Sequence, residues 1–148
     1  MQITSKFTAA VHILACIDIF GGEMRVTSGF LSGSTGVNAV IVRNILGLLR
    51  KGGIVETRQG SGGAMLARPS SEITLYHIYK ACDCASVTGL FRFHENPNAQ
   101  CPVGRNIHKA MDPILQAAQN AMEEKLKGVT LAEVVASTRS LIAENPNG

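Results

Sequence analysis

The feature that most constrains the fold is a series of short elements separated by glycines between residues 27 and 69. Thr27 or Ser28 can cap a first, weak helix, and the glycine-containing stretch 34–37 is expected to turn. A second, stronger helix is predicted over residues 38–51. Its helically spaced apolar residues are Ile41, Ile45, Leu48 and Leu49. Two helices joined by such a tight turn form a helix-turn-helix.

A β-hairpin is predicted directly after these two helices. Residues 54–58 have a strand pattern, the Gln-Gly-Ser-Gly-Gly stretch 59–63 must turn, and residues 64–67 can return as a second strand. Pro69 ends the hairpin because a proline cannot donate a hydrogen bond to a neighbouring strand. The order helix, helix, hairpin is typical of a winged helix-turn-helix. We therefore predict a mainly α fold with a two-stranded β wing.

Further helices are predicted on both sides of this segment. They are a first helix over 5–20, a short helix over 74–81 and a short C-terminal helix over 130–143 that opens with a capping box. A sustained apolar period near 3.6 residues predicts a long helix over 106–127. Pro113 lies inside this pattern, so it must either kink the helix or occupy its first turn.

The positive charge of the chain is concentrated in one third of its length. The whole chain carries a formal net charge of +3, with 45% hydrophobic and 17% charged residues, which is the composition of an ordinary globular protein. Residues 24–68 hold six basic residues and one acid, a net charge of +5, and the remainder is therefore −2. A positive field on one segment favours a polyanion as partner, although a chance excess of arginine would look the same.

The helix-turn-helix and the hairpin tip offer the groups that duplex DNA requires. The N-terminal end of the second helix presents free N–H groups and short side chains, and Arg43 is the best candidate for a guanine or phosphate contact. The glycines of the hairpin tip allow a close approach to the minor groove, although such a run can also be a simple turn. The candidate DNA-binding residues are Ser34, Thr35, Asn38, Ala39, Val40, Arg43, Arg58, Gln59, Gly60, Ser61, Gly62 and Gly63.

These motifs resemble the Rrf2 family of bacterial transcription regulators. The resemblance is carried by the string VNAVIVRNILGLLRKGGIVETRQGSGGAMLARPSSEITL, and the glycine wing followed by Leu-Ala-Arg-Pro and Glu-Ile-Thr-Leu is its most specific part. The Cys-Pro-Val-Gly stretch and the late Val-Thr-Leu-Ala-Glu box look closer to the YwnA-like branch. The resemblance implies a homodimer that reads a palindromic operator in double-stranded DNA. It also implies DNA contacts from Thr4, Ser5, Lys6, Thr27 and Ser28.

The same resemblance assigns a role to the long helix, which would cross its partner in the dimer. Its apolar stripe is then expected to be buried against the second subunit. The dimerisation residues are Ile107, Met111, Ile114, Leu115, Ala118 and Met122. The chain divides accordingly into a DNA-binding domain over 1–81, a sensor loop over 82–104, and a dimerisation helix with a C-terminal helix over 105–148.

The cysteines depart from the family pattern. Family members that bind an iron–sulfur cluster carry three cysteines about five residues apart, whereas this chain has Cys82 and Cys84 and then Cys101. We therefore expect no iron–sulfur cluster, no metal and no other cofactor. Cys101 precedes a helix whose N-terminus can lower its pKa, which makes it the best redox-sensing candidate. Cys82 and Cys84 could pair with Cys101 only if the loop brings them close, and a small buried residue is the plainer alternative for Cys101.

The leading hypothesis is a sequence-specific DNA-binding regulator, most simply a repressor, whose affinity changes when a redox or thiol-reactive signal reaches the 82–101 loop. The alternatives are a metal or iron–sulfur sensor and a winged-helix module that binds protein instead of DNA. We find no catalytic motif and expect no enzyme activity. The chain has no signal sequence and no run of roughly 20 apolar residues, so a cytoplasmic protein without membrane contact is expected. The sequence does not identify a small effector.

Overall fold

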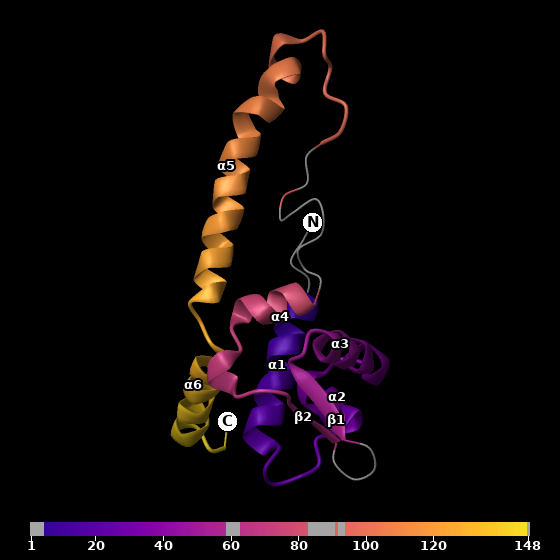
Figure 1. Cartoon of the computed structure of the whole chain (residues 1–148), viewed down its shortest axis with the longest axis vertical. Helices are drawn as coiled ribbons and strands as arrows, with labels where there is room; N and C mark the ends of the chain where they lie inside the picture. The colour runs from indigo at the N-terminus through magenta and orange to yellow at the C-terminus, as the bar shows by residue number, and fades with distance from the viewer. Residues whose placement is uncertain (1–4, 59–62, 83–90, 92–93, 148) are drawn as a thin grey trace.

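The computed structural model describes residues 5–58, 63–82, 91 and 94–147. Its helices and strands form a head, from which one long helix, α5 (Pro102–Lys127), extends (Figure 1). Helices predominate and the sheet has two strands, so the predicted fold class is confirmed.

The helix-turn-helix consists of α2 (Ser28–Thr35) and α3 (Ala39–Lys51). Thr27 caps α2 by accepting a hydrogen bond from the Phe30 amide at 3.1 Å, and the Asn38 side chain caps α3. The turn predicted over 34–37 is wrong in its first two residues, because α2 continues to Thr35. Gly36 ends α2 with a φ of +72°, a conformation that glycine adopts without steric cost.

The core face of α3 is offset from the predicted one. Its buried side chains are Val42, Ile45 and Leu49, whereas Ile41 is 49% exposed. The apolar residues of α3 outnumber the positions that one face can bury, so the periodicity alone did not select between Ile41 and Val42.

The wing pairs β1 (Val55–Arg58) with β2 (Gly63–Leu66) as antiparallel strands. Both strands agree with the predicted hairpin to within one residue at either end. The start of β2, beside the turn of the hairpin, is joined to the segment before α2 because the Ala64 amide donates to the Val26 carbonyl at 3.0 Å. Gly63, at φ +65°, permits this approach, since a Cβ there would lie 2.7 Å from the Val26 carbonyl oxygen.

The core of the head surrounds α1 (Ser5–Phe20), which contacts α2, α3, α4 (Leu75–Ala81) and α6 (Leu131–Glu144). Six consecutive or near-consecutive residues of α1 are buried: Ala10, Ile13, Leu14, Ala15, Cys16 and Ile17. A short 3-10 helix, η1 (Ser70–Glu72), leads into α4. Both α4 and α6 begin with a capping box, as the sequence predicts for α6.

Two backbone hydrogen bonds join the starts of α4 and α6. The Leu131 amide donates to the Ile73 carbonyl at 2.7 Å, and the Leu75 amide donates to the Val129 carbonyl at 2.9 Å. The segment that connects α5 to α6 is therefore attached to the head by its backbone as well as by the buried side chain of Leu131.

Helix α5 begins at Pro102, four residues before the predicted start. Pro102 occupies the first turn, where its missing N–H costs nothing, and Cys101 is the N-cap residue. Gly104 lies where the preceding loop crosses the helix, because a Cβ there would be 2.4 Å from the Asn98 carbonyl oxygen. Pro113 therefore lies in the helix interior and not in the first turn, so the second of the two predicted alternatives is wrong.

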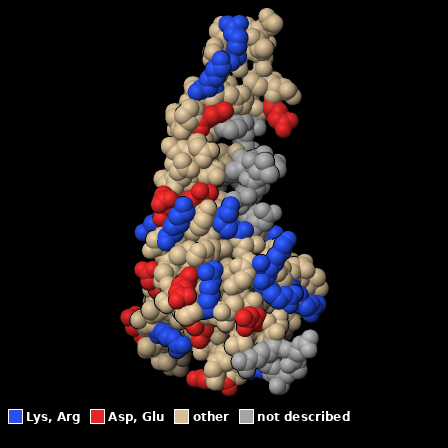
Figure 2. Space-filling view, in the orientation of Figure 1, with Lys and Arg blue, Asp and Glu red and all other residues tan. Residues whose placement is uncertain are grey.

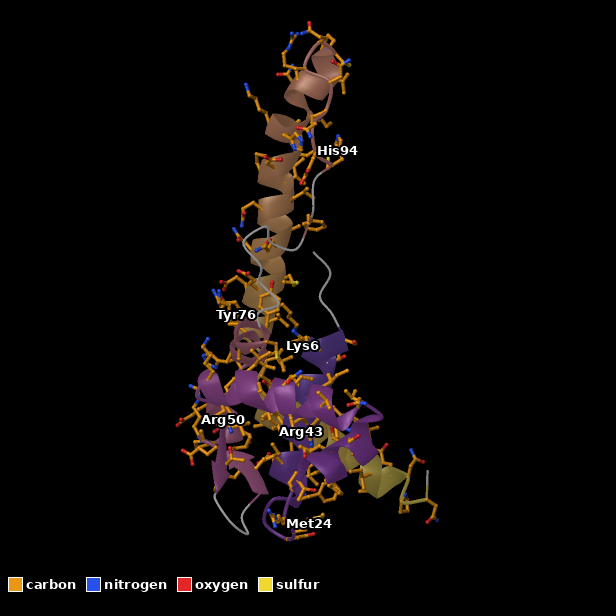
Figure 3. The ribbon with its side chains drawn as sticks, turned by 90° about the vertical axis from the view of Figure 1, so that its right-hand side faces the viewer. Lys6, Met24, Arg43, Arg50, Tyr76 and His94 are labelled. Atoms are coloured by element: carbon orange, nitrogen blue, oxygen red, sulfur yellow. The ribbon has the colours of Figure 1, made fainter. Side chains whose placement is uncertain are left out.

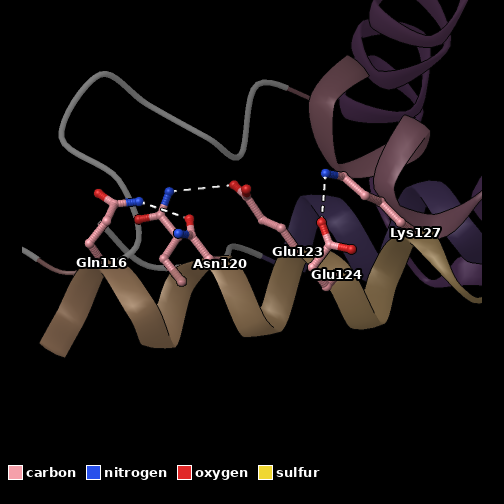
Figure 4. A network of polar contacts seen from close by, with 6 residues as sticks. Gln116, Asn120, Glu123, Glu124 and Lys127 are labelled. Atoms are coloured by element: carbon pink, nitrogen blue, oxygen red, sulfur yellow. Dashed lines mark hydrogen bonds and ion pairs between the residues drawn. The ribbon is translucent and has the colours of Figure 1, made fainter. Parts of the chain in front are cut away.

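Polar side chains along α5 pair with one another at helical spacing. Gln116 donates to Asn120 at 3.0 Å, Gln119 donates to Glu123 at 3.4 Å, and Lys127 donates to Glu124 at 3.0 Å (Figure 4). Pairs of this kind each stabilise a solvated helix by only a few tenths of a kcal/mol, roughly 0.2–0.5. At helical spacing they lie on the side of α5 away from Met111 and Ile114.

Candidate nucleic-acid interface

A groove of about 370 Å³ opens where α2, α3 and the wing meet. The start of α2 forms one wall, the outer face of α3 forms a second, and the two strands form a third. The lining residues are Arg25, Val26, Thr27, Ser28, Arg43, Leu46, Gly47, Arg50, Val55, Thr57, Gly63 and Ala64. Three elements that follow one another in the sequence thus converge on one surface.

Three arginines give the groove its charge. Arg25 precedes α2, and Arg43 and Arg50 lie two turns apart on α3; all three are exposed. Lys and Arg side chains gather on the flank of the head that α3 occupies (Figure 2). None of the described lining residues is acidic, so the groove favours an anionic partner.

Arg50 links α3 to the wing. Its Nη1 donates to the Thr57 hydroxyl of β1 at 2.9 Å, which fixes the wing relative to α3. A guanidinium has five N–H donors, so Arg50 keeps donors for a phosphate while it holds Thr57. Figure 3 shows Arg43 and Arg50 on α3, with Met24 at the end of the head near the wing.

Several of the predicted site residues meet in this groove. Thr27, Ser28, Arg43 and Gly63 all line it. Asn38 lies at the adjoining N-terminus of α3, where its side-chain oxygen accepts a hydrogen bond from the Val40 amide at 2.8 Å. Ala39 and Val40 form the first turn of α3.

Two predicted residues have other contacts. The Ser34 hydroxyl lies 3.0 Å from Nε2 of His12 and 3.3 Å from Sγ of Cys16, so it joins α2 to α1. The Thr35 hydroxyl donates to the Leu31 carbonyl and accepts from the Val37 amide, which stabilises the turn. A DNA contact by these two hydroxyls stays a prediction.

The remaining predicted residues lie at the edges of the described chain. Ser5 and Lys6 are exposed in the first turn of α1, and Lys6 is labelled in Figure 3. Arg58 ends β1, but its side chain is not described. The predictions that fall outside the described residues are Thr4, Gln59, Gly60, Ser61, Gly62 and Cys84.

Sequence reasoning missed Arg25, Arg50 and Thr57 as members of the groove, although both arginines were counted in the basic segment. Arg50 could have been found, because it lies seven residues after Arg43 and therefore on the same face of a helix. Arg25 and Thr57 carry no such local signal, since only the folded wing brings them to α3.

Cys82 and Cys101, the two described cysteines of the predicted sensor segment, belong to different helices. Cys82 is buried at the end of α4, whereas Cys101 is partly exposed at the start of α5, which is about 39 Å long at 1.5 Å per residue (Figure 1). The backbone amides of Gly104 and then Val103 lower the pKa of the Cys101 thiol. The thiol makes no capping hydrogen bond, so these amides act as nearby dipoles rather than as close donors.

The described part of the chain contains no ready-made metal site, and Cys84 lies outside it. Across ranges 5–58, 63–82 and 94–147, no three His, Cys, Asp or Glu side chains come together as a metal site would require. His94 and His108 stack with ring centroids 5.5 Å apart, and Nδ1 of His108 lies 3.6 Å from Oδ1 of Asp112, which is one polar contact rather than a ligand set. Of the cysteines considered for a cluster, Cys82 lies at the end of α4 and Cys101 at the start of α5.

A helix-turn-helix with a two-stranded wing and an arginine-lined groove between them defines a winged-helix DNA-binding protein. The family model described as "Rrf2: Iron-dependent Transcriptional regulator" matches residues 3–137. The chain belongs to the Rrf2 family, and it is a DNA-binding transcriptional regulator.

Individual relatives agree with this assignment. YwnA of Bacillus subtilis (strain 168), whose name assigns it provisionally to the HTH-type transcriptional regulators, is 35% identical over 90% of this chain and 97% of its own length. A crystal structure of a provisionally named DNA-binding protein is 31% identical, with a TM-score of 0.70 over 88% of this chain and 98% of that one. The T. potens IscR structure shares the fold, with a TM-score of 0.68 at 19% identity over 93% of this chain and 88% of that one.

Both the resemblance read from the sequence and its YwnA-like character are confirmed by these comparisons. Within the described part of the chain, no helix is long and apolar enough to span a bilayer.

Proposed function

We propose that the protein is a homodimeric repressor that binds a palindromic operator, with one arginine-lined groove engaging each half-site. The groove between α2, α3 and the wing carries this proposal. In this arrangement the N-terminal half of α3 enters the major groove, and the wing reaches the neighbouring minor groove.

The groove chemistry divides between phosphate and base contacts. Arg25 and Arg50 lie at its flanks, and the free amides at the N-terminus of α2 add further donors, which suits them to phosphates. Arg43 projects from the middle of α3, where an arginine can donate two hydrogen bonds to guanine. Phosphate contacts set the register, and Arg43 contributes sequence preference.

The exposed stripe of α5 supports the homodimer. None of the 26 residues of α5 is buried within the chain, although several of them are large apolar residues. Met111 is 40% exposed and Ile114 is 66% exposed. Met122 and Leu126, near the end of the helix, pack against the head. A second copy of the chain, related by a two-fold axis, would cover the outer part of the stripe and present two grooves to a palindrome.

The test is selection of a duplex from random sequence, followed by titration of that duplex at several salt concentrations. We expect binding that weakens steeply with salt, because arginine–phosphate contacts release counterions, and a stoichiometry of two chains per duplex. Selection of no sequence, or binding without salt dependence, would contradict the proposal and favour a protein-binding module.

Arg43→Ala is expected to weaken binding to the selected duplex by about 1–3 kcal/mol and to relax sequence preference at one position of each half-site. Arg139→Ala is the matched control, since Arg139 is an exposed arginine of α6 and is not among the groove residues. Equal affinities for the wild type and Arg43→Ala would exclude the proposed base contact.

A thiol signal at Cys101 is a second candidate function, supported by the amides of Gly104 and Val103 that lower its pKa. A thiolate attacks a peroxide oxygen, forming a sulfenic acid as the O–O bond breaks and water leaves after protonation. We expect mass spectrometry after mild peroxide treatment to find Cys101 oxidised before the buried Cys82 and Cys16. Unmodified Cys101 with unchanged DNA binding would remove this candidate.

A further inference from the structure

The outward face of α3 carries one exposed apolar side chain beside the arginines. Val40 is 56% exposed. Arg43 and Gly47 follow it by three and seven residues, and both line the groove. Residues at these spacings share one face of a helix, so Val40 continues the groove face toward the N-terminus of α3.

The opposite face of α3 accounts for the folding of this helix without Val40. Val42, Ile45 and Leu49 are the buried residues, and they fix α3 to the head. Val40 therefore contributes little to the core, and valine is a weaker helix former than alanine or lysine at an exposed position. The local fold does not require an aliphatic side chain at this point.

The side chains exposed on α3 indicate which base each of them, including Val40, could contact. α3 has no acidic residue, and its exposed polar side chains before the last turn are those of Arg43 and Asn44. The side-chain oxygen of Asn38 is already bonded to the Val40 amide. Arginine suits guanine and asparagine suits adenine, whereas an alkyl side chain in the major groove suits the C5-methyl group of thymine.

The charge around Val40 favours DNA over an apolar peptide. A peptide that covered Val40 would also bury or displace Arg43, whose exposed guanidinium would need a new partner. Duplex DNA supplies anionic phosphates for the arginines and places a methyl group within the same groove. One ligand thus satisfies both kinds of side chain.

We propose that Val40 is a specificity-determining residue that packs against the C5-methyl group of one thymine in each operator half-site. This inference rests on the proposed DNA-binding function. It adds that the first turn of α3 recognises a thymine. Removal of that methyl group should reduce affinity by about fourfold per half-site, the factor expected for burial of one methylene-sized group.

The test uses the full-length protein and the duplex obtained by selection. Each thymine is replaced in turn by deoxyuridine, which keeps base pairing and lacks only the methyl group, and the Kd is measured for the wild type, Val40→Ala and Ile41→Ala. Ile41 is the matched control, because it is 49% exposed one residue further along the same helix but points about 100° away. Thermal unfolding confirms that the variants keep the fold.

We expect one thymine per half-site at which deoxyuridine weakens wild-type binding by about fourfold. Val40→Ala should bind the unmodified duplex more weakly and be insensitive to that replacement, whereas Ile41→Ala should keep the wild-type pattern. A wild type indifferent to every deoxyuridine, or a Val40→Ala variant with the wild-type pattern, would overturn this inference while the selected duplex still supports the proposed function. If selection yields no duplex, both proposals fail together.

Discussion

At the scale of single residues, His77 shows how a side chain can stabilise a helix in only one protonation state. Its Nδ1 accepts a hydrogen bond from the Thr74 amide at 3.1 Å, and its own amide donates to the Thr74 hydroxyl at 3.1 Å. A protonated Nδ1 cannot accept this bond. Desolvation first, and the charge of Arg68 second, lower the pKa of His77.

This geometry predicts a loss of stability in mild acid. Because the pKa of His77 in the folded chain lies below the unfolded value of about 6.5, the unfolded chain binds the proton more readily. The contribution is fully present above pH 6.5 and is lost as the pH falls through the lowered pKa. Urea unfolding between pH 7.5 and pH 5 measures it. His77→Gln, which keeps an acceptor at this position, should flatten the dependence relative to the wild type; equal slopes would contradict the assignment.

Some residues of the candidate site can be predicted from a local sequence pattern, and others cannot. Arg43 was predicted because a helix-turn-helix places the start of its second helix at DNA, and this pattern is local. Arg25 joins the groove only because β2 packs against the residues before α2, which is a long-range contact. The Ser34 hydroxyl was assigned to DNA from its position in the turn, whereas the structure adds contacts with His12 and Cys16.

At the scale of the elements, Gly63 determines how the wing sits against the helix-turn-helix. Gly63→Ala should destabilise the fold by about 1–3 kcal/mol, because a Cβ would meet the Val26 carbonyl oxygen at 2.7 Å and the backbone has a positive φ. Gly33→Ala is the control, since nothing lies within 4 Å of its Cβ position in α2 and alanine should stabilise that helix. Chemical unfolding compares the two; a neutral Gly63→Ala would contradict the close packing seen here.

The observed helix starts agree with the predicted ones wherever a capping side chain marks them. Capping side chains at Thr27, Asn38 and Thr130 each mark a helix start that the sequence predicts. The start of α5 was misplaced because Pro102 and Gly104 are usually found outside helices. Proline is nevertheless suited to a first turn, and Gly104 is explained only by the loop that crosses it at Asn98.

At the scale of the whole molecule, the exposed stripe of α5 is expected to hold two chains together. Ile114→Glu should weaken the dimer by roughly 3 kcal/mol or more, about a hundredfold in Kd, because an unpaired carboxylate would be buried at the interface. Ile114 is 66% exposed in the single chain, so the head should keep its stability. Sedimentation equilibrium measures the dimer, and Gln116→Glu adds the same charge on the polar side as a control. A monomeric wild type, or an unaffected Ile114→Glu, would contradict this role.

The joint between α5 and the head has a geometric consequence. The hydrogen bonds from Leu131 to Ile73 and from Leu75 to Val129 attach the C-terminal end of α5 to the head. A small rotation of α5 at this end therefore moves its N-terminal end by a larger distance. With an arm of about 39 Å, a turn of only about 5° at the joint displaces the far end by about 3.4 Å. That displacement equals the rise of roughly one base pair along DNA. In the proposed homodimer, a modest rotation at this joint would therefore shift the two heads relative to a fixed spacing of half-sites.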